Sequence, residues 1–65
     1  MSSFNGKVAV VTGAASGIGR ELSLQMSREG GVIIAADYDK KNLDETVKMV
    51  KSSGGEAFGY KLDIS

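Results

Sequence analysis

Three glycines behind an apolar run constrain the fold of this chain more than any other feature. Residues 8–11 read Val-Ala-Val-Val, and Gly13, Gly17 and Gly19 follow them. A nearly continuous β-branched run is typical of a strand buried in a parallel sheet. Glycines at this point let the backbone turn sharply and approach a ligand closely, and the N–H groups that begin the next helix lack intrahelical partners. We therefore predict a strand, a turn and a helix whose start binds phosphate.

Predicted strands and helices alternate along the rest of the chain. The remaining elements are a helix over 17–29, a strand over 32–36, a helix with Asp39 as its N-cap that closes at 52–55, and a strand over 57–63. This order, β-α-β-α-β, predicts an α/β fold with a doubly wound parallel sheet, of which these residues form the first half.

Apolar side chains recur at helical spacing in both predicted helices. Ile18, Leu22 and Met26 share one face of the first helix. On the second helix, Asp44 and Lys48 stand four positions apart, which predicts an ion pair. We predict that six side chains pack in the core or between helices: Leu22, Met26, Leu43, Val47, Met49 and Val50.

The predicted topology leaves one face of the sheet uncovered. Right-handed crossovers that move in one direction along the sheet give the strand order 3-2-1 and place both helices on the same face. The segments 8–11 and 32–36 show no polar alternation that would suit a face open to water. We therefore expect residues 1–65 to be the amino-terminal half of a larger nucleotide-binding domain, or to need a partner that covers the bare face.

Composition excludes several classes of function. Eight basic and eight acidic side chains balance to a net charge of zero, which gives no reason to expect nucleic acid or an anionic membrane as a partner. The 65 residues contain no Cys and no His, so we predict no disulfide, no zinc site of the usual kind and no histidine base among them. The first residues lack the pattern of a signal peptide, and we expect a cytoplasmic protein.

The segment 12–19, Thr-Gly-x-x-x-Gly-Ile-Gly, resembles the cofactor fingerprint of the short-chain dehydrogenase/reductase family. The resemblance covers residues 7–65, which correspond to the opening portion of the family's usual length. It implies a Rossmann-type fold and an oxidoreductase that transfers a hydride between a nicotinamide cofactor and an alcohol or ketone. It also implies a homo-oligomer for the full-length protein.

By this resemblance, the residues of the glycine segment have separate roles in cofactor binding. Gly13 permits the turn, and Gly19 allows close packing of the helix. Ser16, together with the backbone of Gly17 and Ile18, lines the adenosine and pyrophosphate side. Ser16 has an alternative role of equal weight, as a loop hydroxyl that caps the helix.

Asp37 is the predicted determinant of cofactor choice. It ends the second predicted strand near the offset of about 20 residues at which an acidic residue hydrogen-bonds an adenosine ribose. A carboxylate there accepts from the ribose hydroxyls and repels a 2′-phosphate. Ser16 and Tyr38 are neutral residues at two positions where NADP-preferring relatives often place a basic side chain. The basic residues Arg20 and Lys40 lie close by. We predict NAD, with NADP the less favoured cofactor; the alternative for Asp37 is a solvated strand end or a helix cap.

The segment 62–65, Leu-Asp-Ile-Ser, resembles the part of the family that contacts the adenine ring. In that role Asp63 would accept from the exocyclic amine, and the backbone N–H of Ile64 would face a ring nitrogen. The alternative for Asp63 is an acidic residue that simply ends a strand.

No catalytic residue is predicted among these 65 residues. The family's chemistry depends on a serine and a Tyr-x-x-x-Lys pair, but Tyr38 is followed at that spacing by Asn42, and Tyr60 by Ile64. These residues are therefore expected to bind cofactor without turning over substrate. Two alternatives stay open: a non-enzymatic dinucleotide-binding module and, less favoured, a Rossmann-like methyltransferase.

Overall fold

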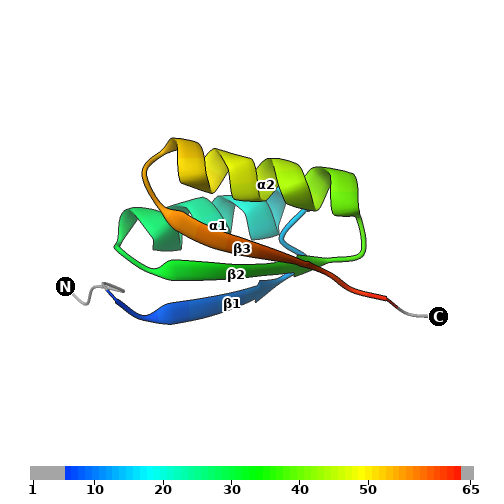
Figure 1. Ribbon diagram of the computed structural model, residues 1–65, viewed down its shortest axis with the longest axis horizontal. Coiled ribbons are helices and arrows are strands. Elements are labelled where there is room, and N and C mark those ends of the chain that lie inside the picture. The colour runs from blue at the N-terminus through cyan, green and yellow to red at the C-terminus, as the bar shows by residue number, and fades with distance from the viewer. Residues whose placement is uncertain (1–5, 64–65) are drawn as a thin grey trace.

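A three-stranded parallel sheet with both helices on one face makes up the fold (Figure 1). The computed structural model describes residues 6–63. Its elements are β1 (Val8–Thr12), α1 (Gly17–Arg28), β2 (Val32–Asp37), α2 (Lys40–Ser52) and β3 (Glu56–Lys61). The strands lie in the order β1-β2-β3, so the predicted α/β class, strand order and placement of the helices are confirmed.

The register of the sheet brings the carboxyl ends of all three strands to one edge. Thr12 pairs with Ala36, and Asp37 pairs with Lys61. The loop from β1 to α1 and the start of α2 lie at this same edge, toward which the strand arrows point in Figure 1. Ligands of open α/β sheets bind outside the carboxyl ends of the strands, so this edge is the place to look for a site.

The core lies between the sheet and the two helices. Ile33 from β2 and Leu43 and Val50 from α2 are almost completely buried. Burying a side chain of this kind stabilises the fold by about 1.5–3 kcal/mol relative to leaving it exposed. The core predictions for Leu43 and Val50 are confirmed, and Val47 packs partly buried against the same cluster.

The prediction that Leu22 is a core residue is wrong, because α1 packs through a different face. Leu22 is 45% exposed and Ile18 is 84% exposed, while Met26 is partly buried against the core. The buried residues of α1 are Gly19, Ser23, Leu24 and Ser27. Small residues at every fourth position bring the helix close to its neighbours and turn its apolar face outward. The prediction that Met49 on α2 is a core or packing residue is also wrong, because its side chain is 38% exposed and it is not part of the core cluster.

The predicted ion pair on α2 forms with a different lysine. Asp44 accepts from the Nζ atom of Lys40 at 2.7 Å, so the predicted Asp44–Lys48 pair is replaced by one that reaches toward the helix start. A side chain on a helix faces the positions four residues before and four residues after it, and spacing alone does not choose between them. Both groups are exposed, so the pair is worth about 0–1 kcal/mol.

The second face of the sheet is bare within residues 6–63, as the topology predicted (Figure 1). Val10, Ile34 and Phe58 lie side by side across the three strands on this face. Val10 is 68% exposed and Phe58 is 50% exposed, and Val8 and Tyr60 are more than half exposed as well. An apolar row of this kind on a sheet face is typical of a surface that another layer covers.

Candidate functional site

The loop between β1 and α1 begins with a turn that only glycine adopts easily. Gly13 has a φ of +71°, in the left-handed region. Ser16 is the N-cap of α1: its Oγ accepts from the N–H of Gly19 at 3.2 Å and donates to the carbonyl of Gly13 at 2.7 Å. The capping alternative for Ser16 is therefore confirmed, and its contact with a cofactor stays a prediction.

The three glycines of the loop differ in what the chain itself requires of them. Gly13 is required by its backbone conformation. At Gly19 a Cβ atom would overlap the carbonyl oxygen of Gly13 and lie 2.7 Å from its carbonyl carbon. At Gly17 a Cβ atom would meet nothing within 4 Å, and its φ is not positive. Backbone conformation therefore explains the first glycine and packing within residues 6–63 explains the third, but neither explains the second.

Two backbone donors at the start of α1 face no acceptor in the part of the chain that the structure describes. The N–H of Gly19 donates to Ser16 Oγ and that of Arg20 to the Ser16 carbonyl, but those of Gly17 and Ile18 have no such partner. The first turn of α1 carries no acidic side chain. Such donors, together with the helix dipole, stabilise an anion at a helix start by about 0.3–1 kcal/mol in an exposed position.

The carboxylate of Asp37 lies at the end of β2, against the same loop. Its Oδ2 atom accepts from the N–H of Ala15 at 2.9 Å, and its Oδ1 atom accepts from the N–H of Asp39 at 3.0 Å. The N–H of Asp39, and then that of Ala15, hold the pKa of Asp37 below its ordinary value. Because a carboxylate offers about four lone-pair positions, both oxygens keep capacity for ribose hydroxyls. Asp39, not Asp37, is the N-cap of α2.

The remaining predicted contact residues lie at the same edge of the sheet where the structure describes them. Tyr38 follows Asp37 and is 55% exposed. The N–H of Leu62 donates to the Asp37 carbonyl at 2.8 Å, which places the exposed Asp63 just beyond the end of β3. Ile64 lies outside the described residues.

The guanidinium of Arg20 is bound to α2. Its Nε atom donates to Thr46 Oγ1 at 2.9 Å, one terminal nitrogen donates to the Asn42 carbonyl at 3.1 Å, and the other lies 3.4 Å from Glu45 Oε1. Lys40 is paired with Asp44. Arg20 and Lys40 are therefore both engaged with residues of α2.

Thr46 is a residue of this region that the sequence prediction missed. It is fully buried, and its Oγ1 atom lies 3.0 Å from the carbonyl oxygen of Ala14 in the glycine loop. The available signal was a polar residue one helical turn from both Leu43 and Val50, on the apolar face of α2.

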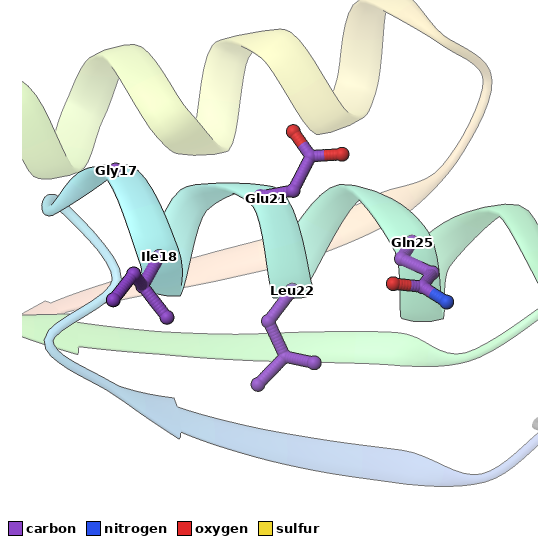
Figure 2. Close-up of a pocket in the computed structure, with 5 residues that line it drawn as sticks. All are labelled: Gly17, Ile18, Glu21, Leu22 and Gln25. Atoms are coloured by element: carbon purple, nitrogen blue, oxygen red, sulfur yellow. The ribbon is translucent and has the colours of Figure 1, made fainter.

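An open groove of about 380 Å³ runs from the start of α1 along its outer face (Figure 2). Gly17, Ile18, Glu21, Leu22 and Gln25 line it. Ile18 and Leu22 point away from α2 in this view. The groove has no basic side chain, so its donors to an anion are the backbone N–H groups at the Gly17 and Ile18 end and the side-chain amide of Gln25.

The parallel β-α-β-α-β unit, with a glycine loop at the strand ends and an acidic residue after β2, defines a Rossmann-type α/β domain. The profile of the short chain dehydrogenase family matches residues 7–65. The chain belongs to this family. Within residues 6–63, no helix has the length and apolar character needed to cross a membrane, and no group of three or more metal-ligating side chains comes together.

Individual proteins of known name or structure agree with this assignment. The chain is 43% identical over 60 residues to a 3-oxoacyl-[acyl-carrier-protein] reductase of Thermotoga maritima, covering 92% of this chain and 24% of the reductase. It is 40% identical to a short chain dehydrogenase/reductase of Burkholderia phymatum solved in complex with NAD, with a TM-score of 0.89 over 97% of this chain and 22% of the other. A metagenomic short-chain oxidoreductase in complex with NADP has 34% identity and a TM-score of 0.89, covering 95% of this chain and 28% of the other.

The chain spans about a quarter of the length of each of these three proteins. Relatives of this fold bind NAD in one case and NADP in another, so the family defines a nicotinamide cofactor without choosing between the two.

Proposed function

We propose that these residues are the adenosine- and pyrophosphate-binding half of a dinucleotide-binding domain. The protein to which it belongs is proposed to be an NAD-dependent oxidoreductase that transfers a hydride between the nicotinamide and an alcohol or ketone. The residues proposed to contact the cofactor are Gly13, Ser16, Gly17, Ile18, Gly19, Asp37, Tyr38, Asp63 and Ile64.

The observation that carries the proposal is the empty space at Gly17. A glycine opens α1 there although neither its φ nor its packing requires one. Within a helix, glycine is less favourable than most residues, and Gly17 is the first residue of α1. The open N–H groups of Gly17 and Ile18 adjoin this space, and a pyrophosphate that approached them would need the room that a Cβ atom would fill.

The preference for NAD rests on charge at the end of β2. Asp37 is negatively charged at neutral pH, and two backbone N–H groups stabilise the carboxylate further. The 2′-phosphate of NADP would meet this charge, while Arg20 and Lys40 are engaged with α2. The ribose hydroxyls of NAD, in contrast, can donate to the carboxylate.

Titration of the complete protein with NAD and with NADP tests this preference. We expect NAD to bind at least about fivefold more tightly, since one uncompensated contact between like charges costs on the order of 1 kcal/mol or more. Equal affinities, or tighter binding of NADP, would contradict the role assigned to Asp37.

The catalytic part is proposed to lie outside residues 1–65, because neither tyrosine of the chain has a lysine four positions after it. The complete protein is proposed to be cytoplasmic and homo-oligomeric and to act on a small alcohol or ketone.

A further inference from the structure

One peptide group of the glycine loop is held from both sides. The carbonyl oxygen of Ala14 lies 3.0 Å from Thr46 Oγ1 of α2, and the N–H of Ala15 donates to Asp37 Oδ2 at 2.9 Å. These two atoms belong to the same peptide plane. Rotation of that plane would therefore break both hydrogen bonds at once.

The hydroxyl of Thr46 has two acceptors in reach but only one proton. The carbonyl oxygens of Ala14 and Asn42 lie 3.0 Å and 3.1 Å from it. Arg20 donates from Nε to the hydroxyl oxygen and from a terminal nitrogen to the Asn42 carbonyl. Because Arg20 already serves Asn42, the proton of Thr46 is left for Ala14.

Burial raises the energetic cost of losing the hydrogen bond from Thr46 to the Ala14 carbonyl. Ala14 and Thr46 are both fully buried, so no water replaces the hydroxyl if it is removed. The Ala14 carbonyl would then be unsatisfied where it stands, and rotation toward solvent would relieve it. That rotation would turn the Ala14 carbonyl oxygen, which is the negative end of the peptide dipole, away from α2. It would also disturb the N–H groups that follow in the loop.

We propose that Thr46 is a positioning residue of the cofactor site, which holds the Ala14–Ala15 peptide so that the start of α1 presents N–H groups, and not a carbonyl, to the pyrophosphate. The inference rests on the proposed function, because it assumes that phosphate binds at Gly17 and Ile18. It adds a contact to the loop from α2, the element on the other side of the Ala14 carbonyl.

The test compares ADP with adenosine as ligands of the complete protein. Thr46→Val keeps the shape of the side chain and removes the hydroxyl, and Thr46→Ser is the matched control that keeps it. We expect Thr46→Val to weaken ADP binding about tenfold, which corresponds to the loss of one buried hydrogen bond, and to leave adenosine binding unchanged. Thr46→Ser should bind both ligands as the parent protein does.

The outcomes separate this inference from the proposed function. If the parent protein binds ADP no more tightly than adenosine, the phosphate site itself is wrong. If the parent prefers ADP and Thr46→Val prefers it equally, or loses both ligands to the same degree, Thr46 only supports the fold and the inference is overturned.

A second variant covers the case in which Thr46→Val does not fold. Arg20→Met leaves the threonine hydroxyl in place but removes the two donors that direct its proton to Ala14. The expected result is a loss of about threefold in ADP affinity alone. Unchanged ADP affinity in this variant would overturn the inference.

Discussion

At the scale of single residues, the glycines of the loop separate folding from binding. Gly17→Ala adds a methyl group that meets nothing in the described chain, while Gly19→Ala forces a methyl group against the Gly13 carbonyl. We expect Gly17→Ala to keep its stability and lose affinity for NAD by about tenfold or more. Gly19→Ala should lower the free energy of unfolding by about 1–3 kcal/mol.

Urea unfolding and NAD titration of the two variants distinguish these expectations. The pair is matched, since each variant adds one methyl group within the same turn. A Gly17→Ala protein that binds NAD as tightly as the parent would remove the main support for a ligand at this position.

The charge of Asp37 predicts a dependence of stability on pH. Its pKa is lowered in the folded protein, first by the N–H of Asp39 and then by that of Ala15. The stabilisation is therefore fully present above the ordinary pKa of about 3.9 and is lost as pH falls through the lower value of the folded state. The Asp37→Asn variant has no carboxyl group at this position, so its stability lacks this dependence on pH.

Urea unfolding across a pH series measures this effect. The difference in unfolding free energy between the parent and Asp37→Asn should be constant near neutral pH and shrink in acid below about pH 4. A difference that persists unchanged to strongly acid pH would mean that the carboxylate charge does not stabilise the loop.

At the scale of elements, α2 was predicted correctly where its apolar stripe was regular. Leu43 and Val50 are buried as the spacing indicated. We expect Leu43→Ala to cost about 2–5 kcal/mol of unfolding free energy. Met49→Ala, on the exposed margin of the same helix, should cost less than about 1 kcal/mol by the same measurement. Similar losses in both variants would contradict the observed packing of α2.

The face of α1 could not be predicted from apolar spacing, for a physical reason. A helix that packs closely uses small residues, and hydropathy gives Gly19, Ser23 and Ser27 no weight. The hydroxyl of the buried Ser23 is satisfied because its Oγ donates to the carbonyl of Gly19 at 2.8 Å. The spacing of Ile18 and Leu22 correctly indicated an apolar face on α1. It could not show that this face points away from the core of residues 6–63.

The candidate site was predictable where it depends on backbone and strand ends, and not where it depends on contacts between elements. The positions of Gly13, Gly19 and Asp37 follow from the order of strand, loop and helix. The contacts of Thr46 with Ala14 and Arg20 join segments far apart in sequence, so no local pattern encodes them. Whether Tyr38, Asp63 and Ile64 contact a cofactor stays a prediction.

At the scale of the whole molecule, the bare sheet face predicts how residues 1–65 behave when they are isolated. Val10 and Phe58 are half exposed or more on that face, and no helix in residues 6–63 covers it. The segment alone is expected to associate through this face or to unfold without cooperativity. Sedimentation and thermal unfolding followed by circular dichroism are the measurements. A soluble monomer with a sharp unfolding transition would contradict the proposal that the face needs a second layer.

The most direct test of the account is to follow backbone amide signals of the complete protein by nuclear magnetic resonance while ADP is added. The account predicts the largest shifts at Gly17 and Ile18, whose N–H groups have no acceptor in the described residues. The next largest shift is expected at Ala15, whose N–H donates to Asp37 in the same loop. Shifts that leave Gly17 and Ile18 unchanged, and fall instead on another part of the chain, would contradict a phosphate site at the start of α1.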